Sequence, residues 1–190
     1  MDLPAIRIDL PEWARTDAFA PGRAFASDQE KMRLAIELSR QNVLHGTGGP
    51  FGAAVFERAT GRLVGVGMNS VVRLNNCALH GEMVAFMVAQ ARLGSFTLRV
   101  PGGPEHELVT SCEPCAMCLG ATLWSGVTRL VCGAARDDAM RLHFEEGPVF
   151  PESIRYLERR GIEIVTGVLR AEANEVLEMY RTRQGTIYNA

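Results

Sequence analysis

Residues 80–118 read HGEMVAFMVAQARLGSFTLRVPGGPEHELVTSCEPCAMC and contain two short motifs, each at the start of a predicted helix. The first motif is His80-Gly81-Glu82, and the apolar spacing that follows it predicts a helix over 80–93. The second motif is Pro114-Cys115-Ala116-Met117-Cys118, whose proline is typical of a helix start and whose helix is predicted over 115–124. Residues 107–111, between the two helices, read as a strand. This succession indicates an α/β fold.

The rest of the chain extends the same alternation on both sides. The predicted helices lie at 27–43, 80–93, 115–124, 151–160 and 171–181, and the predicted strands at 53–56, 63–67, 107–111, 127–133 and 162–166. Five strands that alternate with helices predict a mixed sheet covered by helices on both faces. We expect residues 1–26 to form an irregular arm and residues 27–190 to form a single domain.

Composition and charge exclude several classes of protein. The chain has 190 residues, 47% of them apolar, which suffices for one domain with a real core. Its formal net charge is -2, with acidic and basic residues interleaved, so a polymeric nucleic acid is a poor candidate partner. Residues 1–23 contain three prolines and several charges, which argues against a signal peptide or a membrane span. We expect a cytoplasmic protein.

His80, Cys115 and Cys118 have the placement of metal ligands. Two thiolates three residues apart at a helix N-terminus can hold one ion, and the helix dipole favours their charged form. With His80 as third ligand, a tetrahedral Zn²⁺ keeps its fourth position open for water, which is typical of catalytic zinc sites. Glu82, two residues beyond the histidine, is placed to carry protons from that water to a substrate.

Each half of the pattern also has an ordinary interpretation. A single C-x-x-C can be a redox pair, and a single histidine at a helix start is often a capping residue. Cys112 could extend the cysteine series, but it ends a predicted strand, and a fourth protein ligand would leave no position for water. We therefore expect Cys112 not to bind the metal.

The other cysteines and histidines have no ligand-like spacing. Cys77 and Cys132 are predicted to be small core residues. We expect His45, His106 and His143 to be ordinary surface or capping residues. The glycine-rich segment 46–52 follows a helix and precedes a strand, the reverse of a phosphate-binding loop, and is predicted to be a turn beside the active site.

H-x-E followed by P-C-x-x-C is the signature of zinc deaminases. Over residues 28–190 the chain resembles the guanine deaminase branch of the cytidine deaminase-like superfamily. The matching segments, in order, are Pro50-Phe51-Gly52-Ala53, Asn69, His80 to Glu82, Thr110 to Cys115, and Leu119-Gly120-Ala121 ending in Trp124. The chain departs from the pattern at Gly81, where alanine is usual, and at Asn76-Cys77-Ala78-Leu79, which lacks an aspartate-proline turn.

The resemblance implies a three-layer α/β/α fold with a five-stranded mixed sheet, and zinc-dependent hydrolysis of an amino group on a free nucleobase, most simply guanine to xanthine in purine metabolism. It also implies which residues form the site. Glu82 and Glu146 would be the catalytic carboxylates, and Asn69, Phe51, Trp124, Phe144 and Tyr188 would bind the base. The tail, residues 182–190, would close the site of a partner chain in a homodimer.

Three other functions compete with this one. A tRNA adenosine deaminase shares the signature but would need a basic face, and the arginines at 155, 159 and 160 alternate with glutamates. Cytosine, adenine or an aminotriazine could replace guanine as the aminated ring. A zinc-stabilised scaffold without activity is the third alternative, and the presence of Glu82 argues against it.

Overall fold

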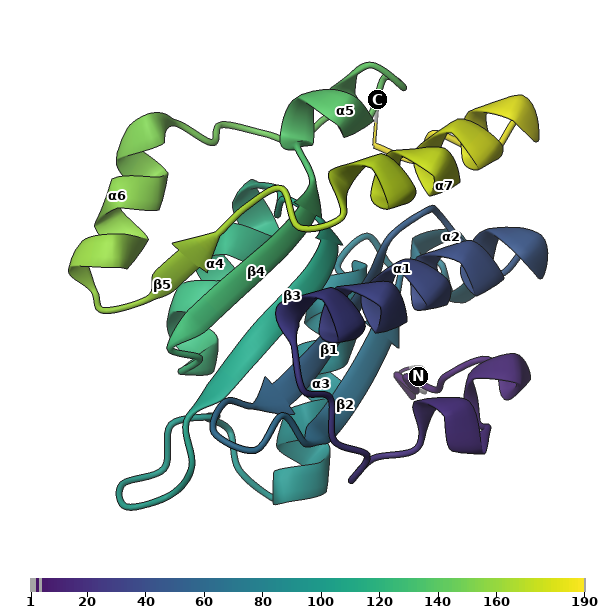
Figure 1. The fold of residues 1–190 in the computed structure, drawn as a ribbon. Helices are drawn as coiled ribbons and strands as arrows, with labels where there is room; N and C mark the ends of the chain where they lie inside the picture. Colours follow the sequence, from purple (N-terminus) through teal and green to yellow (C-terminus); the bar gives the residue numbers. More distant parts are fainter. Residues whose placement is uncertain (1–2, 4, 190) are drawn as a thin grey trace.

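The computed structural model describes residues 3 and 5–189, which form a five-stranded sheet with the strand order β2-β1-β3-β4-β5 (Figure 1). The strands are β1 (Gly52–Glu57), β2 (Leu63–Met68), β3 (His106–Cys112), β4 (Arg129–Ala134) and β5 (Glu163–Val165). Strand β1 pairs antiparallel with β2 and β3, whereas β3, β4 and β5 are parallel to one another. The sheet is therefore mixed, as the alternation of strands and helices predicts.

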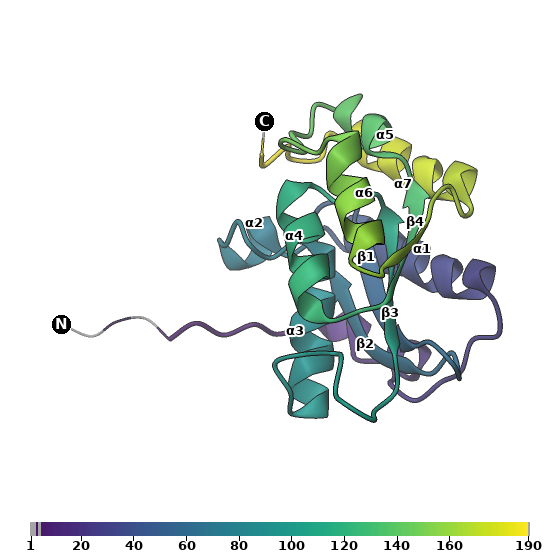
Figure 2. The same ribbon diagram turned by 90° about the vertical axis from the view of Figure 1, so that its left-hand side faces the viewer.

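Helices cover both faces of this sheet. They are α1 (Asp28–Leu44), α2 (Val71–Leu74), α3 (Gly81–Leu93), α4 (Ala116–Ser125), α5 (Arg136–Met140), α6 (Pro151–Arg159) and α7 (Arg170–Thr182). Seen edge-on, α1 and α7 lie on one side of the sheet, and α3, α4 and α6 lie on the other (Figure 2). Two apolar cores fill the two interfaces, with Met32 and Val176 in one and Phe86 and Leu119 in the other. The predicted three-layer α/β/α fold is confirmed.

Start signals in the sequence explain where the longest helices begin and end. The Ser27 hydroxyl accepts a hydrogen bond of 3.2 Å from the Glu30 amide, and the Glu30 carboxylate accepts one of 2.7 Å from the Ala26 amide. The first bond satisfies an amide donor that the first turn of α1 leaves without a partner, and the second ties the residue before the N-cap to the same turn. A stop signal ends helix α3. Its C-cap is Gly94, whose left-handed backbone conformation lets the chain leave the helix.

Residues 11–25 pack onto the domain more closely than an irregular arm would. Two short 3-10 helices, Glu12–Ala14 and Asp17–Phe19, place Ala14 and Phe19 in the core beside α1. A β-bridge between Ala24 and Arg62 ties the end of this segment to the start of β2. The first part of the predicted arm falls partly outside the described residues.

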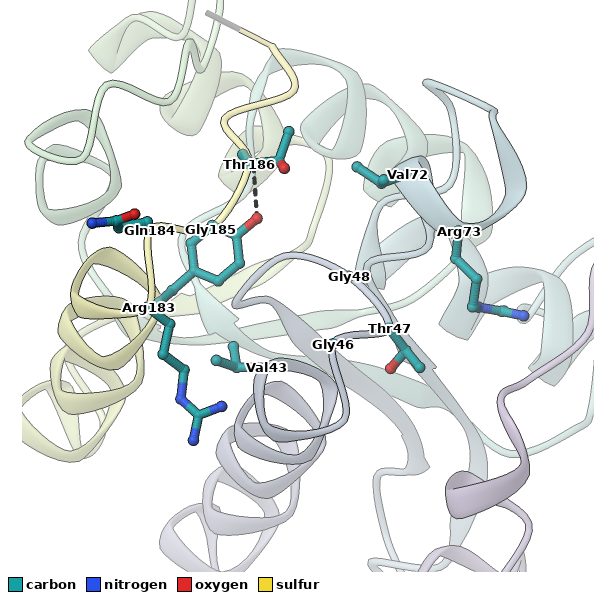
Figure 3. A pocket seen from close by; sticks show the side chains of 11 residues that line it. Val43, Gly46, Thr47, Gly48, Val72, Arg73, Arg183, Gln184, Gly185 and Thr186 are labelled. Carbon is teal, nitrogen blue, oxygen red and sulfur yellow. Dashed lines mark hydrogen bonds between the residues drawn. The ribbon is translucent and has the colours of Figure 1, made fainter.

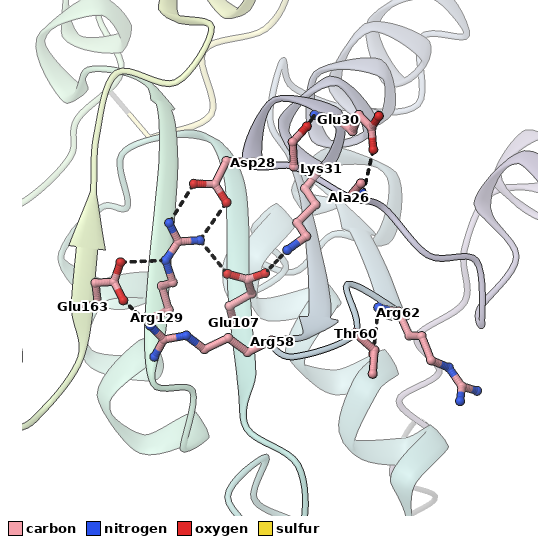
Figure 4. Close-up of polar contacts among 11 residues, drawn as sticks. Ala26, Asp28, Glu30, Lys31, Arg58, Thr60, Arg62, Glu107, Arg129 and Glu163 are labelled. Carbon is pink, nitrogen blue, oxygen red and sulfur yellow. Dashed lines mark hydrogen bonds and ion pairs between the residues drawn. The ribbon is translucent and has the colours of Figure 1, made fainter.

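A buried ionic cluster holds α1, β3 and β4 in register (Figure 4). Glu107, whose side chain is 1% exposed, accepts hydrogen bonds from Lys31 at 2.5 Å and from Arg129 at 2.8 Å. Arg129 also donates to both carboxylate oxygens of Asp28, at 2.7 and 2.8 Å. Because a buried charge without a partner is costly, moving these three elements apart would be unfavourable.

Helix α3 lies very close to strand β2, because the strand presents glycines to it. A Cβ atom at Gly67 would lie 2.2 Å from the carbonyl oxygen of Gly81, and one at Gly65 would lie 2.8 Å from the amide nitrogen of Ala89. Side chains at these two positions would push the helix outward. The short distance between β2 and the start of α3, next to His80, therefore depends on Gly67.

Within residues 3 and 5–189, none of the helices has the length and apolar character needed to cross a lipid bilayer.

Candidate active site

Two helix N-termini bring the predicted metal donors together. His80 is the N-cap of α3, and Cys115 is the N-cap of α4, with Cys118 in the first turn of the same helix. The Nδ1 atom of His80 lies 3.5 Å from the Sγ atom of Cys115. One donor atom from each of the three residues lies within 4.8 Å of the others. His80 and Cys115, which are 35 positions apart in the sequence, thus form one compact group with Cys118.

The chemistry of this donor set fits zinc. Zinc binds thiolate sulfur at about 2.3 Å and imidazole nitrogen at about 2.1 Å, so tetrahedral S and N ligands lie about 3.6 Å apart. The separation of 3.5 Å between His80 and Cys115 agrees with this value. Three protein donors leave one tetrahedral position open, as a catalytic site requires.

The surroundings favour a charged thiolate at Cys115. A hydrogen bond from Cys118 is the main reason that the pKa of Cys115 falls to about 4, and the hydrogen bond with His80 lowers it further against the opposing effect of burial. A thiol with this pKa is deprotonated at neutral pH, which is the state that binds a metal.

Glu82 is a buried carboxyl group beside the donors. It is 7% exposed, and the Cys118 thiol donates to its Oε2 atom at 3.4 Å. Burial, together with the negative charge of Cys115, raises the pKa of Glu82 above its usual range. A raised pKa lets a carboxyl group take up a proton more readily than a free carboxyl group does, which suits a proton carrier.

Glu146 approaches the same group from the loop that follows α5. Its carbonyl oxygen accepts a 2.9 Å hydrogen bond from the Ala116 amide, next to Cys115. Its side chain is buried, and burial, followed by the negative charges of Cys115 and Glu82, raises its pKa to about 8. The exposed neighbour Glu145 has no such surroundings and bonds the Gly147 amide.

Three aromatic rings lie on one side of the donors. The Phe144 ring stands 5.0 Å from that of Phe51 and 5.3 Å from that of Tyr188, measured between centroids. The Tyr188 ring lies 6.0 Å from the His80 ring, and its hydroxyl accepts a 2.7 Å hydrogen bond from the Asn69 side chain. Phe51, Asn69, Phe144 and Tyr188 therefore lie together, and their role in binding a base stays a prediction.

In the single chain, the tail lies over that chain's own site. A short segment joins α7 to Tyr188. Tyr180, in α7, donates a 2.6 Å hydrogen bond to the Thr186 carbonyl in this segment (Figure 3). Exchange of this tail with a partner chain stays a prediction.

The structure does not bring Trp124 into this site. Its side chain is 78% exposed, and its ring lies against Gly120, one turn earlier on the outer face of α4. Trp124 lies six residues after Cys118. At about 100° per residue its side chain is rotated about 120° around the helix from that of Cys118, away from the donors. The predicted role of Trp124 as a base-binding residue is therefore wrong for its own chain.

Two other sequence interpretations also need correction. His106 is 3% exposed instead of lying on the surface, and its Nδ1 atom is 2.7 Å from the Leu98 carbonyl oxygen. Cys77 is exposed and is not a core residue, because it lies in the turn before His80.

Cys132 is buried, as predicted. Cys112 faces the Ala135 carbonyl at 3.6 Å and lies outside the donor group.

Asn42 is a residue that the sequence interpretation overlooked. It is fully buried on α1, and its amide donates to the carbonyl oxygens of Gly49 and Asn69 at 2.8 and 2.9 Å. The signal was present, since a polar residue between Ser39 and Val43 interrupts the buried side of that helix.

A cavity of about 420 Å³ borders this region without reaching the metal donors. Its walls come from the glycine-rich loop after α1, from α2 and from the tail (Figure 3). Thr47 and Gly48 stand at its edge. The glycine-rich segment 46–52, predicted to be a turn beside the active site, therefore contributes to the cavity wall on one side and contacts Asn69 on the other.

Comparison with known proteins gives consistent matches. The family model of the cytidine and deoxycytidylate deaminase zinc-binding region matches residues 26–134. A guanine deaminase of Bacillus subtilis is 33% identical over 131 residues, which cover 69% of this chain and 80% of that protein.

Solved structures agree over a larger part of the chain. The guanine deaminase from Nitrosomonas europaea is 43% identical, with a TM-score of 0.89 over 94% of this chain and 97% of that one. A crystal structure of NE0047 in complex with 2,6-diaminopurine is 44% identical, with a TM-score of 0.90 over 97% of both chains. Since the family model covers more than half of the chain and includes all three donors, the chain belongs to the cytidine and deoxycytidylate deaminase family of zinc-dependent enzymes.

Proposed function

We propose that this chain hydrolyses the amino group of free guanine to give xanthine and ammonia. The observation that carries the proposal is a second buried carboxyl group, Glu146, which together with Glu82 lies beside the donor group. Deamination itself needs one proton carrier. A second carboxylate, placed next to aromatic rings, suits recognition of a ring that presents N–H donors.

The proposed roles follow from the position of each side chain. His80, Cys115 and Cys118 hold the zinc, which when bound lowers the pKa of a coordinated water toward roughly 7 and supplies a nucleophile at neutral pH. Glu82 would take one proton from the attacking water and pass it to the ring nitrogen, and it would then pass the second proton, from the added hydroxyl, to the departing amine. Water thus supplies the oxygen that replaces the amino group, which leaves as ammonia.

Glu146 and Asn69 bind opposite edges of the base. Guanine presents a ring N–H and an amino group side by side, and a carboxylate can accept hydrogen bonds from both. Next to the positive charge of a bound Zn²⁺, the pKa of Glu146 would fall from about 8, which favours its carboxylate form. Asn69 offers its Nδ2 donor, since its Oδ1 atom already accepts from the Gly49 amide at 3.2 Å. Guanine carries the O6 and N7 acceptors that such a donor needs. The similarity to guanine deaminases from two organisms supports the same substrate.

We also infer a cytoplasmic homodimer. The thiols of the donor group must stay reduced to bind zinc, which suits a reducing compartment. The exposed Trp124 gives α4 an aromatic surface residue that a second copy could cover. Sedimentation velocity on the parent protein tests this, and a species with the mass of one chain at all concentrations contradicts it.

Ammonia release from a panel of substrates tests the proposed function. The panel contains guanine, adenine, cytosine, an aminotriazine, guanosine and a tRNA anticodon stem-loop. We expect guanine to have the highest kcat/KM. A higher value for the stem-loop would assign the chain to tRNA adenosine deamination, and a higher value for another ring would replace guanine as substrate. Glu82→Gln serves as the inactive control.

A further inference from the structure

We propose that Trp13, in the segment before the domain, positions the base-binding residue Asn69 through Thr47 and Asn42. The inference rests on the proposed function, in which Asn69 contacts the substrate. Trp13 touches neither the metal donors nor the catalytic carboxylates, so it is a positioning residue. It gives the N-terminal segment, which the activity leaves unexplained, a role in substrate binding.

A continuous series of hydrogen bonds joins these residues. The indole Nε1 atom of Trp13 donates to the Thr47 hydroxyl at 3.0 Å. The Thr47 hydroxyl donates to the Oδ1 atom of Asn42 at 2.7 Å. The Nδ2 atom of Asn42 then donates to the carbonyl oxygens of Gly49, at 2.8 Å, and Asn69, at 2.9 Å. Three stretches that are far apart in sequence, around Trp13, residues 42–49 and Asn69, are linked in this way.

Trp13 fixes the direction of the whole series. An indole N–H can only donate, so the Thr47 oxygen accepts, and its single hydrogen is free to point toward Asn42. The Asn42 Oδ1 atom accepts from this hydroxyl, which leaves the two Asn42 N–H groups for the carbonyl oxygens of Gly49 and Asn69. Without the indole N–H, the Thr47 hydroxyl loses the donor that holds it in this orientation.

The series ends at the atoms that orient the Asn69 side chain. The Gly49 amide donates to the Asn69 Oδ1 atom at 3.2 Å, and the Val71 amide donates to the same atom at 3.4 Å. Asn42 therefore holds the carbonyl groups of both partners of the Gly49–Asn69 contact. With Oδ1 bound, the Nδ2 atom is the group left to face Tyr188 or a base.

Packing holds the indole where the series begins. The Trp13 ring stacks on the His45 ring at 5.6 Å with an interplanar angle of 6°, and it meets the edge of Phe19 at 5.9 Å. Phe19 is itself buried in the core beside α1. The stacking partner, His45, directly follows α1. The indole is thus fixed relative to the helix that carries Asn42.

Paired variants at Thr47 test the proposal. Thr47→Val has the same shape but no hydroxyl, whereas Thr47→Ser keeps the hydroxyl. Trp13→Phe keeps an aromatic ring on His45 and Phe19 and removes the N–H. We expect Thr47→Val to raise the KM for guanine about three- to tenfold, with kcat changed less than about twofold, because the loss of the part-buried hydrogen bond to Asn42 loosens the residues that hold Asn69. Trp13→Phe should raise KM in the same direction, and Thr47→Ser should restore the parent value.

Hydrogen exchange of the peptide that contains residues 46–52 gives a second readout without substrate. We expect faster exchange in Thr47→Val than in the parent, and parent-like exchange in Thr47→Ser. Equal KM values and equal exchange in the valine and serine variants overturn the proposal, and so does a loss of thermal stability without any change in KM.

Failure of the proposed function would look different. If the parent prefers another ring of the panel, the KM ratios are measured on that ring, and the positioning role is judged from them and from the exchange data.

Discussion

The side-chain amide of Asn69 donates a 2.7 Å hydrogen bond to the hydroxyl of Tyr188, although 119 residues separate the two in the sequence. Through this contact the C-terminal tail lies against the region where the base is proposed to bind. The Tyr188 ring also lies near the rings of His80 and Phe144. The tail therefore forms part of the wall of the site.

Deletion of residues 184–190 should raise the KM for guanine about fivefold or more, because it removes this hydrogen bond and the aromatic wall. The midpoint of thermal unfolding should change little, since the tail adds few buried side chains. Tyr188→Phe is the matched variant, which keeps the ring and loses the hydroxyl, and we expect an intermediate KM. An unchanged KM after the deletion would make the tail unimportant for binding.

Glu82→Gln should bind zinc and fold like the parent yet lose nearly all turnover. The amide fills the same space but cannot take up and release the proton that the reaction moves. Metal content, circular dichroism and ammonia release measured on one preparation check this expectation. Substantial remaining activity would show that another group carries the proton.

One zinc ion per chain is expected, held by His80, Cys115 and Cys118. Cys115→Ser should lower the zinc content strongly, because serine removes a thiolate ligand. Cys112→Ser is the control, since Cys112 lies outside the donor group and faces the Ala135 carbonyl. Metal analysis by mass spectrometry decides between them. The reverse pattern, with zinc lost only in the Cys112 variant, contradicts the assignment.

Glu146→Ala should lower kcat/KM for guanine at least about tenfold, because charge-assisted hydrogen bonds to the base are lost. Zinc content should stay the same. Glu145→Ala provides a matched control, since Glu145 is the exposed neighbour. Steady-state kinetics on both variants measure the effect. If both keep the parent value, Glu146 has no part in binding the base.

Asp28→Asn should destabilise the protein at pH 7 more than at acid pH. Hydrogen bonds from Arg129 are the main cause that lowers the pKa of Asp28 below its usual value. A lowered native pKa means that the contribution of Asp28 to stability is present above the unfolded pKa of about 3.9 and is lost as the pH falls through the lower native value.

Urea unfolding of the parent and the Asn variant at several pH values measures this difference. The gap between the two free energies of unfolding should shrink as the pH falls below about 4. Asp17→Asn, on the exposed side of the N-terminal segment, is the control. If the difference between the two free energies of unfolding does not depend on pH, the Arg129–Asp28 pair is not the cause of the destabilisation.

Most of the fold could be predicted from the sequence because its long elements have clear periodicity and clear start signals. The predicted helix over 80–93 agrees with α3, and the predicted strands over 53–56 and 63–67 agree with β1 and β2. Helices α2 and α5 were missed, since four or five residues are too few for a periodic pattern. The bounds of the other elements agree to within a few residues.

The site was predictable where chemistry limits the choice of residue and not where packing decides. Histidine and paired cysteines at helix starts point to a metal whatever the surrounding fold. Trp124 was misplaced because the face of α4 that it occupies depends on the rotation of that helix against the sheet. Asn42 was overlooked because its partners are carbonyl groups, which every residue carries.

The close approach of Gly67 to α3 has a consequence for the interpretation of genetic variants. Any side chain at this position would displace the backbone near Gly81, and with it the adjacent His80. A survey of inactivating substitutions would then score Gly67 as severely as a catalytic residue, although it carries no functional group. Mutational sensitivity in this enzyme would therefore map a larger region than the residues that touch zinc or base. Measured zinc occupancy would separate the two kinds of position.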